Sequence, residues 1–532
     1  MKKMTKAAAA ILSLLMVGTN VIALSSCNKK GSKLVDNVEV VAYDGSAVTV
    51  QFYHTMGANL RSVLDKYIPK FNEMYPNITI EHGTKGDYPG LRDQISTELT
   101  GGNAPSIAYC YPDHVALYNS AKAVLPLDDF IASELEVTKA DGTKDIMGLT
   151  DAQVADYVTA YYEEGRAYGD NVMYTLPFSK STEVLYYNKT EFEKNGWTVP
   201  TTWDEMEALC ATIKAKYPND VPLGYDSEAN WFITMCEQLG SPYTSSKEGE
   251  HFLFNNETNW KFVERFKGWY DKGYVTTEEI YGGYTSDLFT ELGTDEKTGK
   301  AKPRSYMCIG SSAGASYQCP DPLDGDAAEK QYPFEVGVAM VPQSSAEAVT
   351  DLSKAKVISQ GPSICLFKKS NPQEVAAAWL FAKYFTTCIE FQADFSMTSG
   401  YAPVIQSVET DEVYTDFLNT ADGNGNLQAT CVKQCITQKQ ALYVSPAFNG
   451  SSEARDQVGV LVQDVFVNKN KEDTSTPEKL RAFVKKHFDA AIEELEYFYG
   501  AEFILINKCN CNEKNILSII VALRYIKWFC GL

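Results

Sequence analysis

The apolar positions of the chain repeat with two periods, every second residue in some stretches and every third or fourth in others. Residues 47–53 alternate as in a β-strand, and residues 60–75 carry an apolar face at helical spacing. The same order follows with a strand at 77–81, a helix at 88–100 and a strand at 106–111. Strands that alternate with amphipathic helices predict an α/β fold in which helices cover a sheet.

Two later helices have clear N-terminal signals. Thr202 and Glu205 have the spacing of a capping box, and Asn371 precedes a proline as an N-cap residue does. We therefore expect one helix to start after Thr202 and another after Asn371, the second including residues 375–387. The place of Trp203 beside the capping box favours a structural role over a role in ligand binding.

The N-terminus has the pattern of a secretory signal. Three lysines precede an apolar run over residues 7–24, and Leu-Ser-Ser then precedes Cys27, which resembles the lipobox of bacterial lipoproteins. The pattern predicts a lipoprotein signal peptide at 1–26, a lipidated tether at 27–46 that starts with acylated Cys27, and a folded body from residue 47. The chain would then be held by its lipid on the extracytoplasmic face of the cell membrane. An ordinary signal peptide or an uncleaved anchor are the alternatives.

The C-terminal residues 501–532 differ in character from the body. Their apolar run at 516–523 is far shorter than the ~20 residues that span a bilayer. We predict an atypical, poorly ordered tail, with an additional anchor helix as the alternative.

Composition narrows the classes of function. The formal net charge of −21 argues against nucleic acid as a partner, because such surfaces need clustered basic residues. The 32 Tyr against 5 His favour binding by stacking and hydroxyl contacts over metal or acid–base chemistry. Cys431 and Cys435 lie one helical turn apart without a nearby His, so we expect no metal and no cofactor.

Catalytic motifs are scarce. Residues 310–314 match the nucleophile elbow GxSxG, but only His487 follows, in a lysine-rich helical stretch. Residues 422–426 resemble the start of a calcium loop without its glycine or closing glutamate, and a Gly- and Asn-rich turn is the better interpretation. A glycoside hydrolase needs only two placed carboxylates, so 69 Asp and Glu leave it open.

Several short motifs recur along the body of the chain, at 52–56, 71–76, 102–105, 177–189, 200–203 and 399–403. Together they resemble one family, the extracellular solute-binding proteins of carbohydrate-type ABC importers. Within it, the chain is most similar to members that bind glycerol-3-phosphate. The likeness covers roughly residues 48–499.

The resemblance implies a two-lobed periplasmic-binding-protein-like fold, with a ligand cleft between α/β lobes that three hinge crossings join. The crossings are expected near 174–185, 305–309 and 357–366. The implied division assigns 47–176 plus 305–358 to lobe 1, and 177–304 plus 359–500 to lobe 2.

The resemblance also implies ligand contacts. Asp113 enters this set because Pro112 stands where the family has a glutamate that binds glycerol, and Asp113 is the adjacent carboxylate. This difference weakens the case for glycerol-3-phosphate itself as the ligand, whereas the residue expected to bind a phosphate group is still present. The expected ligand-binding residues are Tyr88, Asp113, Ser181, Ser311, Gly361, Tyr401 and the phosphate-gripping Arg455.

The function implied is capture of a small molecule for ABC permease subunits, without catalysis. The ligand is expected to be a glycerol-3-phosphate-like phosphoester or a sugar. A secreted glycoside hydrolase and a surface lipoprotein without a transport role are the alternatives.

Overall fold

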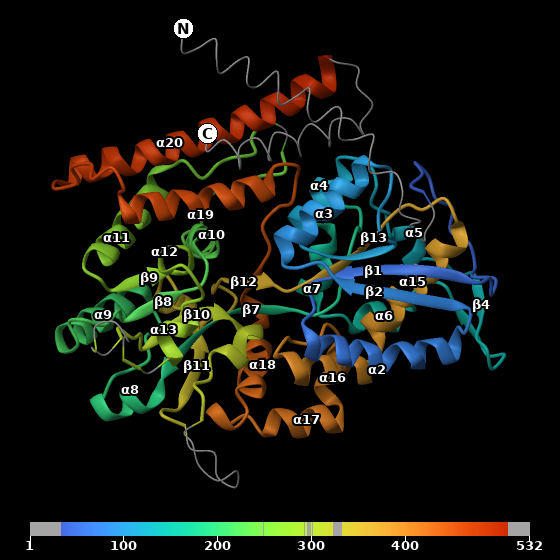
Figure 1. Ribbon diagram of the computed structural model, residues 1–532, viewed down its shortest axis with the longest axis horizontal. Coiled ribbons are helices and arrows are strands. Elements are labelled where there is room, and N and C mark those ends of the chain that lie inside the picture. Colours follow the sequence, from blue (N-terminus) through green and yellow to red (C-terminus); the bar gives the residue numbers. More distant parts are fainter. Residues whose placement is uncertain are drawn as a thin grey trace.

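The computed structural model describes residues 33–508, apart from residues 248, 292, 295–298, 300–301 and 323–331. The predicted signal peptide, the predicted acylation site Cys27 and residues 509–532 of the predicted tail lie outside the described residues. Two sheets with covering helices form two lobes that lie side by side (Figure 1). The expected two-lobed α/β architecture is thereby confirmed.

The first lobe is built on a five-stranded sheet in the order β2-β1-β3-β13-β6. The strands β2, β1 and β3 are parallel, and β13 and β6 are antiparallel to their neighbours. Their bounds are β1 (Val48–His54), β2 (Ile78–Thr84), β3 (Ile107–Cys110), β6 (Leu176–Pro177) and β13 (Ser363–Leu366).

Helices with one apolar face cover this sheet. Phe52 of β1 and Phe381 of α15 are fully buried and meet edge to face, with ring centroids 5.6 Å apart. The helices are α2 (Ala58–Met74), α3 (Tyr88–Thr100), α4 (Pro112–Asn119), α15 (Pro372–Thr387) and α16 (Ile389–Ser399).

The second lobe contains a seven-stranded sheet in the order β14-β12-β7-β10-β8-β9, with β11 also paired to β7. The strands are β7 (Ser181–Asn188), β8 (Leu223–Tyr225), β9 (Val275–Thr277), β10 (Met307–Ser311), β11 (Val336–Met340), β12 (Val357–Gln360) and β14 (Leu442–Tyr443). Its main helices are α9 (Trp203–Lys216), α10 (Glu228–Gln238), α11 (Glu257–Asp271), α19 (Ser451–Val467) and α20 (Pro477–Lys508).

The capping box predicted at Thr202 and Glu205 is confirmed. Glu205 N donates to Thr202 Oγ1 at 3.3 Å, and Thr202 N donates to Glu205 Oε2 at 3.3 Å. Trp203 is 2% exposed and donates from Nε1 to Gln238, so its structural role is also confirmed.

The chain passes between the sheets three times, but one predicted crossing is misplaced. The passages from β6 to β7 and from β12 to β13 lie inside the predicted ranges. The third runs through α18 (Leu427–Thr437), whose buried Leu427 and Val432 belong to different cores.

The predicted crossing at 305–309 is instead β10, which lies between β7 and β8 inside the second sheet. The strands β10, β11 and β12 therefore belong to the second lobe, and β13 with α15 and α16 belongs to the first. The predicted division of the segments 305–358 and 359–500 is corrected accordingly. A short apolar run in the sequence predicts a strand, but it does not indicate which sheet that strand joins.

The folded body also begins earlier than residue 47. Val35 N donates to Lys368 O at 3.2 Å, and Tyr43 is 6% exposed and packs against Tyr75. Residues 38–43 supply apolar side chains to the first core, so this part of the predicted tether is packed. At the other end, α20 continues past residue 500 to Lys508.

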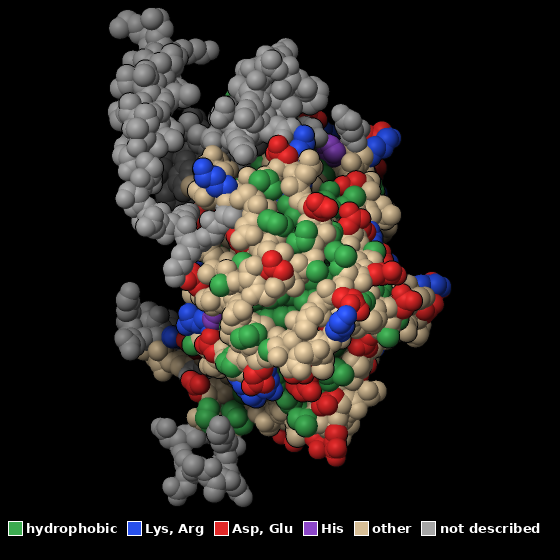
Figure 2. Space-filling view, turned by 90° about the vertical axis from the view of Figure 1, so that its right-hand side faces the viewer, with side chains coloured by type: hydrophobic (Ala, Val, Ile, Leu, Met, Phe, Trp, Pro, Cys, Tyr) green, Lys and Arg blue, Asp and Glu red, His purple; other side chains and the backbone are tan. Residues whose placement is uncertain are grey.

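No helix in the described part of the chain is both long and apolar enough to cross a membrane. The face of the first lobe carries many scattered acidic side chains and few, well-separated basic ones (Figure 2). This distribution agrees with the net charge of −21.

Candidate functional site

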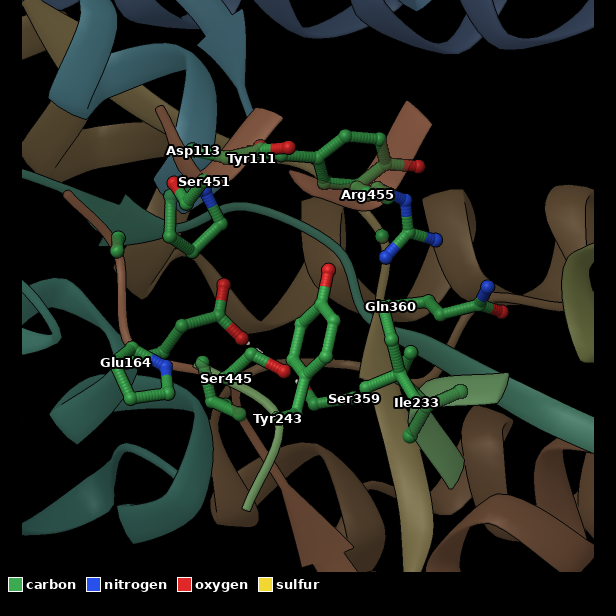
Figure 3. Close-up of a pocket in the computed structure, with 16 residues that line it drawn as sticks. Tyr111, Asp113, Glu164, Ile233, Tyr243, Ser359, Gln360, Ser445, Ser451 and Arg455 are labelled. Atoms are coloured by element: carbon green, nitrogen blue, oxygen red, sulfur yellow. Dashed lines mark hydrogen bonds between the residues drawn. The ribbon is translucent and has the colours of Figure 1, made fainter. Parts of the chain in front are cut away.

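A cavity that is partly open to solvent lies between the two lobes (Figure 3). The first lobe contributes residues at the start of α4, and the second contributes β12, the first turns of α19 and a loop after α10. The lining residues that carry polar side chains are Tyr111, Asp113, Glu164, Tyr243, Ser359, Gln360, Ser445, Ser451 and Arg455.

On the first-lobe side, Asp113 stands in the first turn of α4, where the helix dipole stabilises a carboxylate. Its Oδ1 accepts from the backbone N–H of His114 at 3.0 Å, which holds the side chain in place. Pro112 occupies the first helical position, so the carboxylate next to it, rather than Pro112, supplies the polar group of this wall.

A cluster of tyrosines borders this wall. The Tyr88 and Tyr111 rings are stacked, with centroids 4.4 Å apart and planes at 29°. Burial raises the pKa of Tyr401, and a contact with the Tyr88 hydroxyl acts in the opposite direction. Tyr88 and Tyr401 therefore lie next to the cavity through Tyr111, although neither is among the residues that line it.

On the second-lobe side, Arg455 lies in the second turn of α19 and donates to Asn230 Oδ1. Asn230 in turn donates to Glu183 at 2.7 Å, and Tyr225 donates to the other Glu183 oxygen at 2.6 Å. Burial raises the pKa of Glu183 to about 7, against the opposing effect of these hydrogen bonds and of the Arg455 charge. This chain of contacts orients the guanidinium of Arg455, which lines the cavity.

The crossing from β12 to β13 forms another wall at Gly361. Its φ of +87° belongs to the left-handed region, and a Cβ there would lie 2.5 Å from Ser179 O. Only glycine fits this close approach of the two crossings.

A buried ion pair joins the same two crossings. Lys180, which is fully buried, donates to Glu164 and also to Gly361 O at 3.2 Å. Glu164 further accepts from Ser359 and Ser363, at 3.0 and 3.3 Å.

The two expected serines lie elsewhere. Ser311 Oγ donates to Ser181 Oγ at 3.3 Å, and neither residue lines the cavity. Ser311 also accepts from the N–H of Ala313 and so caps a short 3-10 helix, η2 (Ser312–Tyr317), where the elbow motif lies.

The structure thus brings Asp113, Gly361 and Arg455 into one cavity and places Tyr88 and Tyr401 at its border. The other polar residues that line the cavity were not predicted as site residues; they are Tyr111, Glu164, Tyr243, Ser359, Gln360, Ser445 and Ser451. Tyr243 lies in the loop between α10 and α11, and its aromatic side chain was the one available signal.

Two alternatives raised by the sequence, a calcium loop at residues 422–426 and a metal site, can be compared with the structure. Asn424, in the calcium-loop-like segment, accepts from Val336 N at 2.7 Å and donates to Phe334 O at 2.6 Å, as a turn residue does. Among the described residues, no group of three or more His, Cys, Asp or Glu side chains is arranged to hold a metal ion.

Comparison with known proteins gives a family match. A family model described as bacterial extracellular solute-binding protein matches residues 66–420. The sn-glycerol-3-phosphate-binding periplasmic protein UgpB of Escherichia coli O1:K1 is 27% identical over 271 residues, which cover 47% of this chain and 58% of that protein. The protein of the same name from Salmonella typhimurium is 29% identical over 268 residues, covering 46% and 57%. The matched part of the chain thus spans little more than half the length of these relatives.

Solved structures show the same fold at low identity. UgpB from Mycobacterium tuberculosis, in complex with glycerophosphocholine, superposes with a TM-score of 0.60 at 15% identity, covering 86% of this chain and 99% of that one. An ABC substrate-binding protein from Listeria monocytogenes, in complex with cycloalternan, gives 0.61 at 16% identity, covering 85% and 99%.

Proposed function

Since the chain belongs to the family of bacterial extracellular solute-binding proteins, we propose that it captures a small polar solute between its lobes for an ABC importer. The relatives named above are binding proteins, so family membership favours binding over the glycoside hydrolase that the sequence left open. A ligand that touches both lobes binds the closed arrangement more tightly and shifts the population toward it.

The observation that carries the choice of ligand is the pair of opposite charges in the cavity. Arg455 from the second lobe offers a planar set of donors, which suits an anionic group such as phosphate. Asp113 from the first lobe offers an acceptor for a hydroxyl group. A glycerol-3-phosphate-like phosphoester carries both groups, and the first turn of α19 adds the positive end of a helix dipole.

A neutral sugar is the second candidate. The stacked Tyr88 and Tyr111 and the neighbouring Tyr401 provide aromatic surface at the border of the cavity. Asp113 and Arg455 would then both bind sugar hydroxyls.

We also propose that the protein is lipid-anchored through Cys27 on the extracytoplasmic face of the membrane. The support is the sequence around Cys27. Labelling with a palmitate analogue should mark the wild-type protein and not Cys27→Ala, which should leave the membrane fraction. Equal labelling of both would contradict the anchor.

A melting-temperature panel tests the ligand class. The protein without its signal peptide is heated with sn-glycerol-3-phosphate, a glycerophosphodiester or maltose, and the expected ligand raises the melting temperature without turnover. No shift with any of the three would contradict the proposal.

Replacement of Arg455 tests the phosphate assignment. We expect Arg455→Ala to weaken binding of sn-glycerol-3-phosphate tenfold or more in calorimetry, because a charge-assisted contact is lost. Arg265→Ala is the matched control, since that arginine pairs with Asp204 and Glu207 on the surface of the second lobe. Unchanged affinity in Arg455→Ala would favour the sugar.

A further inference from the structure

The hydroxyl of Tyr243 is a buried polar group inside the proposed binding cavity. Tyr243 is 5% exposed, and its hydroxyl has no hydrogen-bond partner among the described residues. Figure 3 shows the hydroxyl pointing into the cavity, between the carboxylate of Glu164 and the guanidinium of Arg455. A buried hydroxyl without a partner costs folding free energy, so its presence in a ligand cavity calls for an explanation.

Backbone pairing and aromatic packing fix the loop that carries Tyr243. The carbonyl of Tyr243 accepts from Leu253 N at 3.0 Å, and Thr244 forms a β-bridge with Phe252. The ring of Tyr243 lies against Phe232 and Phe254, with centroids 6.3 and 6.0 Å away. The apolar side of the ring is therefore packed, and the hydroxyl is directed into the cavity by its surroundings.

The loop is also tied to the walls of the cleft. His251 stacks on Phe448, with centroids 4.5 Å apart and planes at 12°. Across from it, Ser246 lies against Gly169 of the first lobe, so close that a Cβ on Gly169 would be 2.9 Å from Ser246 Oγ. None of the motifs that carry the family resemblance includes this loop.

The charges around the hydroxyl indicate what it faces. Burial raises the pKa of Tyr243, and the positive charge of Arg455 acts against this rise. The negative charge of Asp113, which lines the same cavity, raises the pKa of Tyr243. A phenol O–H next to a guanidinium is suited to an oxygen that accepts from both.

We propose that Tyr243 contacts the ligand and determines specificity by donating its hydroxyl proton to the anionic group that Arg455 faces. This inference rests on the proposed function and adds to it a second donor for the same group. A neutral ligand oxygen at this position gains less from the phenol, because hydrogen bonds to ionised acceptors are about twice as strong as neutral ones. Tyr243 thus favours an anionic solute over a neutral one of similar size.

The experiment compares Tyr243→Phe with Tyr118→Phe. Tyr118 is 0% exposed, and its hydroxyl likewise has no hydrogen-bond partner in the described part of the chain, but it lies in the first core and does not line the cavity. We expect Tyr243→Phe to weaken sn-glycerol-3-phosphate binding about tenfold in calorimetry and maltose binding, where measurable, about threefold or less. Tyr118→Phe should stay within twofold of wild type, and neither variant should melt at a lower temperature without ligand.

Two results would overturn the inference. Wild-type affinity of Tyr243→Phe for sn-glycerol-3-phosphate would show that the hydroxyl does not contact the ligand. A ligand-free melting temperature that falls by several degrees in Tyr243→Phe but not in Tyr118→Phe would show a structural role. Failure of the proposed function is recognised separately, because the wild-type protein would then bind none of the probes.

Discussion

At the scale of single residues, Gly361 shows how a backbone requirement shapes the site. Its left-handed φ and the 2.5 Å approach of a Cβ to Ser179 O leave no room for another residue. We expect Gly361→Ala to destabilise the protein strongly in urea unfolding and to lower ligand affinity, because the two crossings must move apart. Gly45→Ala is the control, since Gly45 has a φ of +86° and nothing within 4 Å of its Cβ position. It should cost only about 1 kcal/mol, and equal losses in both variants would contradict the steric argument.

His54 supplies a pH-dependent contribution to stability. Met56 N donates to its Nδ1 at 3.2 Å, so the proton stays on Nε2, which contacts His82 Nδ1 at 3.0 Å. His82 Nε2 continues the chain to Asp65 at 2.8 Å. Burial, and then the neighbouring His82, lower the pKa of His54 to about 3.

Because this pKa is depressed in the folded state, the contribution of His54 is fully present above its ordinary pKa of about 6.5. It is lost as pH falls from there toward 3, since the unfolded chain takes up the proton first. We expect His54→Gln to be less stable than wild type at pH 7, with the difference in unfolding free energy shrinking by pH 4.5. A difference that stays constant over this range would contradict the assignment.

At the scale of elements, the helices and strands that the sequence predicted are confirmed, because their signals are local. The periodicity at 88–100 and the capping box at Thr202 lie within a few residues of the structure they specify. The membership of β10 could not be predicted, because pairing with β7 and β8 depends on residues far away in the chain. Arg455 could be predicted because its motif resembles that of the family. Tyr243 could not be predicted, because it lines the cavity only through the packing of its loop.

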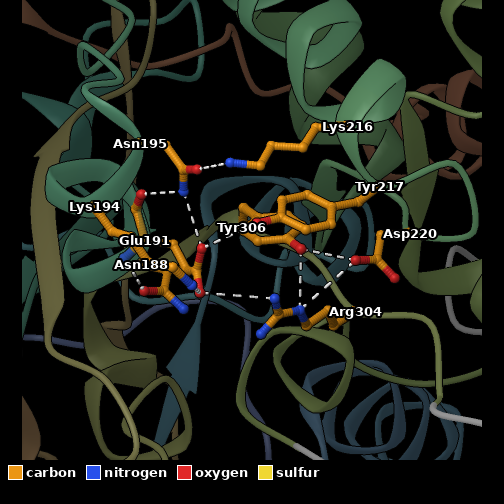
Figure 4. A network of polar contacts seen from close by, with 9 residues as sticks. All are labelled: Asn188, Glu191, Lys194, Asn195, Lys216, Tyr217, Asp220, Arg304 and Tyr306. Carbon is orange, nitrogen blue, oxygen red and sulfur yellow. Dashed lines mark hydrogen bonds and ion pairs between the residues drawn. The ribbon is translucent and has the colours of Figure 1, made fainter.

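A polar network joins α8 (Lys189–Asn195), the end of α9 and the start of β10 (Figure 4). The hydroxyl of Tyr306 accepts from Arg304 Nε at 3.1 Å and donates to Asp220 at 2.8 Å. The Tyr306 ring stacks on Tyr217, with centroids 5.2 Å apart. These contacts join the end of α9 to the start of β10, and the hydroxyl of Tyr217 donates to Glu191 of α8 at 3.4 Å.

We expect Tyr306→Phe to lower the free energy of unfolding by about 1–2 kcal/mol, because two hydrogen bonds of a buried hydroxyl are lost. Lys216→Ala, at the exposed edge of the same network, should change it by less than about 0.5 kcal/mol. Urea unfolding of both variants checks this, and ligand affinity should stay at the wild-type value in each. A larger loss of unfolding free energy in Lys216→Ala than in Tyr306→Phe would contradict this expectation.

At the scale of the whole molecule, the two lobes are linked at the crossings by the Glu164–Lys180 pair. Lys180 lies on the passage from β6 to β7, and Glu164 accepts from Ser359 and Ser363 on either side of the second passage. The side chains of Lys180 and Glu164 are 0% and 3% exposed. One buried carboxylate thus connects both crossings about which the lobes would close.

Removal of one partner leaves the other charge buried and uncompensated. We expect Glu164→Gln to lose about 3–5 kcal/mol of unfolding free energy. The double variant Glu164→Gln with Lys180→Met should regain most of this loss, because it leaves no uncompensated charge in the buried site. The control is Glu136→Gln, which breaks the exposed pair with Lys144 and should cost less than about 0.5 kcal/mol.

The double variant also separates stability from closure. If the pair serves only to neutralise two buried charges, the double variant will bind ligand as the wild-type protein does once it is stable. If it also sets the angle between the lobes, the double variant will be stable but will bind more weakly. The ligand-induced decrease in radius of gyration, measured by small-angle scattering, will then be smaller, because an altered hinge changes the free-energy difference between open and closed states. Since the Glu164 carboxylate holds Ser359 as well as Lys180, we expect the second outcome. A double variant as unstable as Glu164→Gln alone would contradict the charge argument itself.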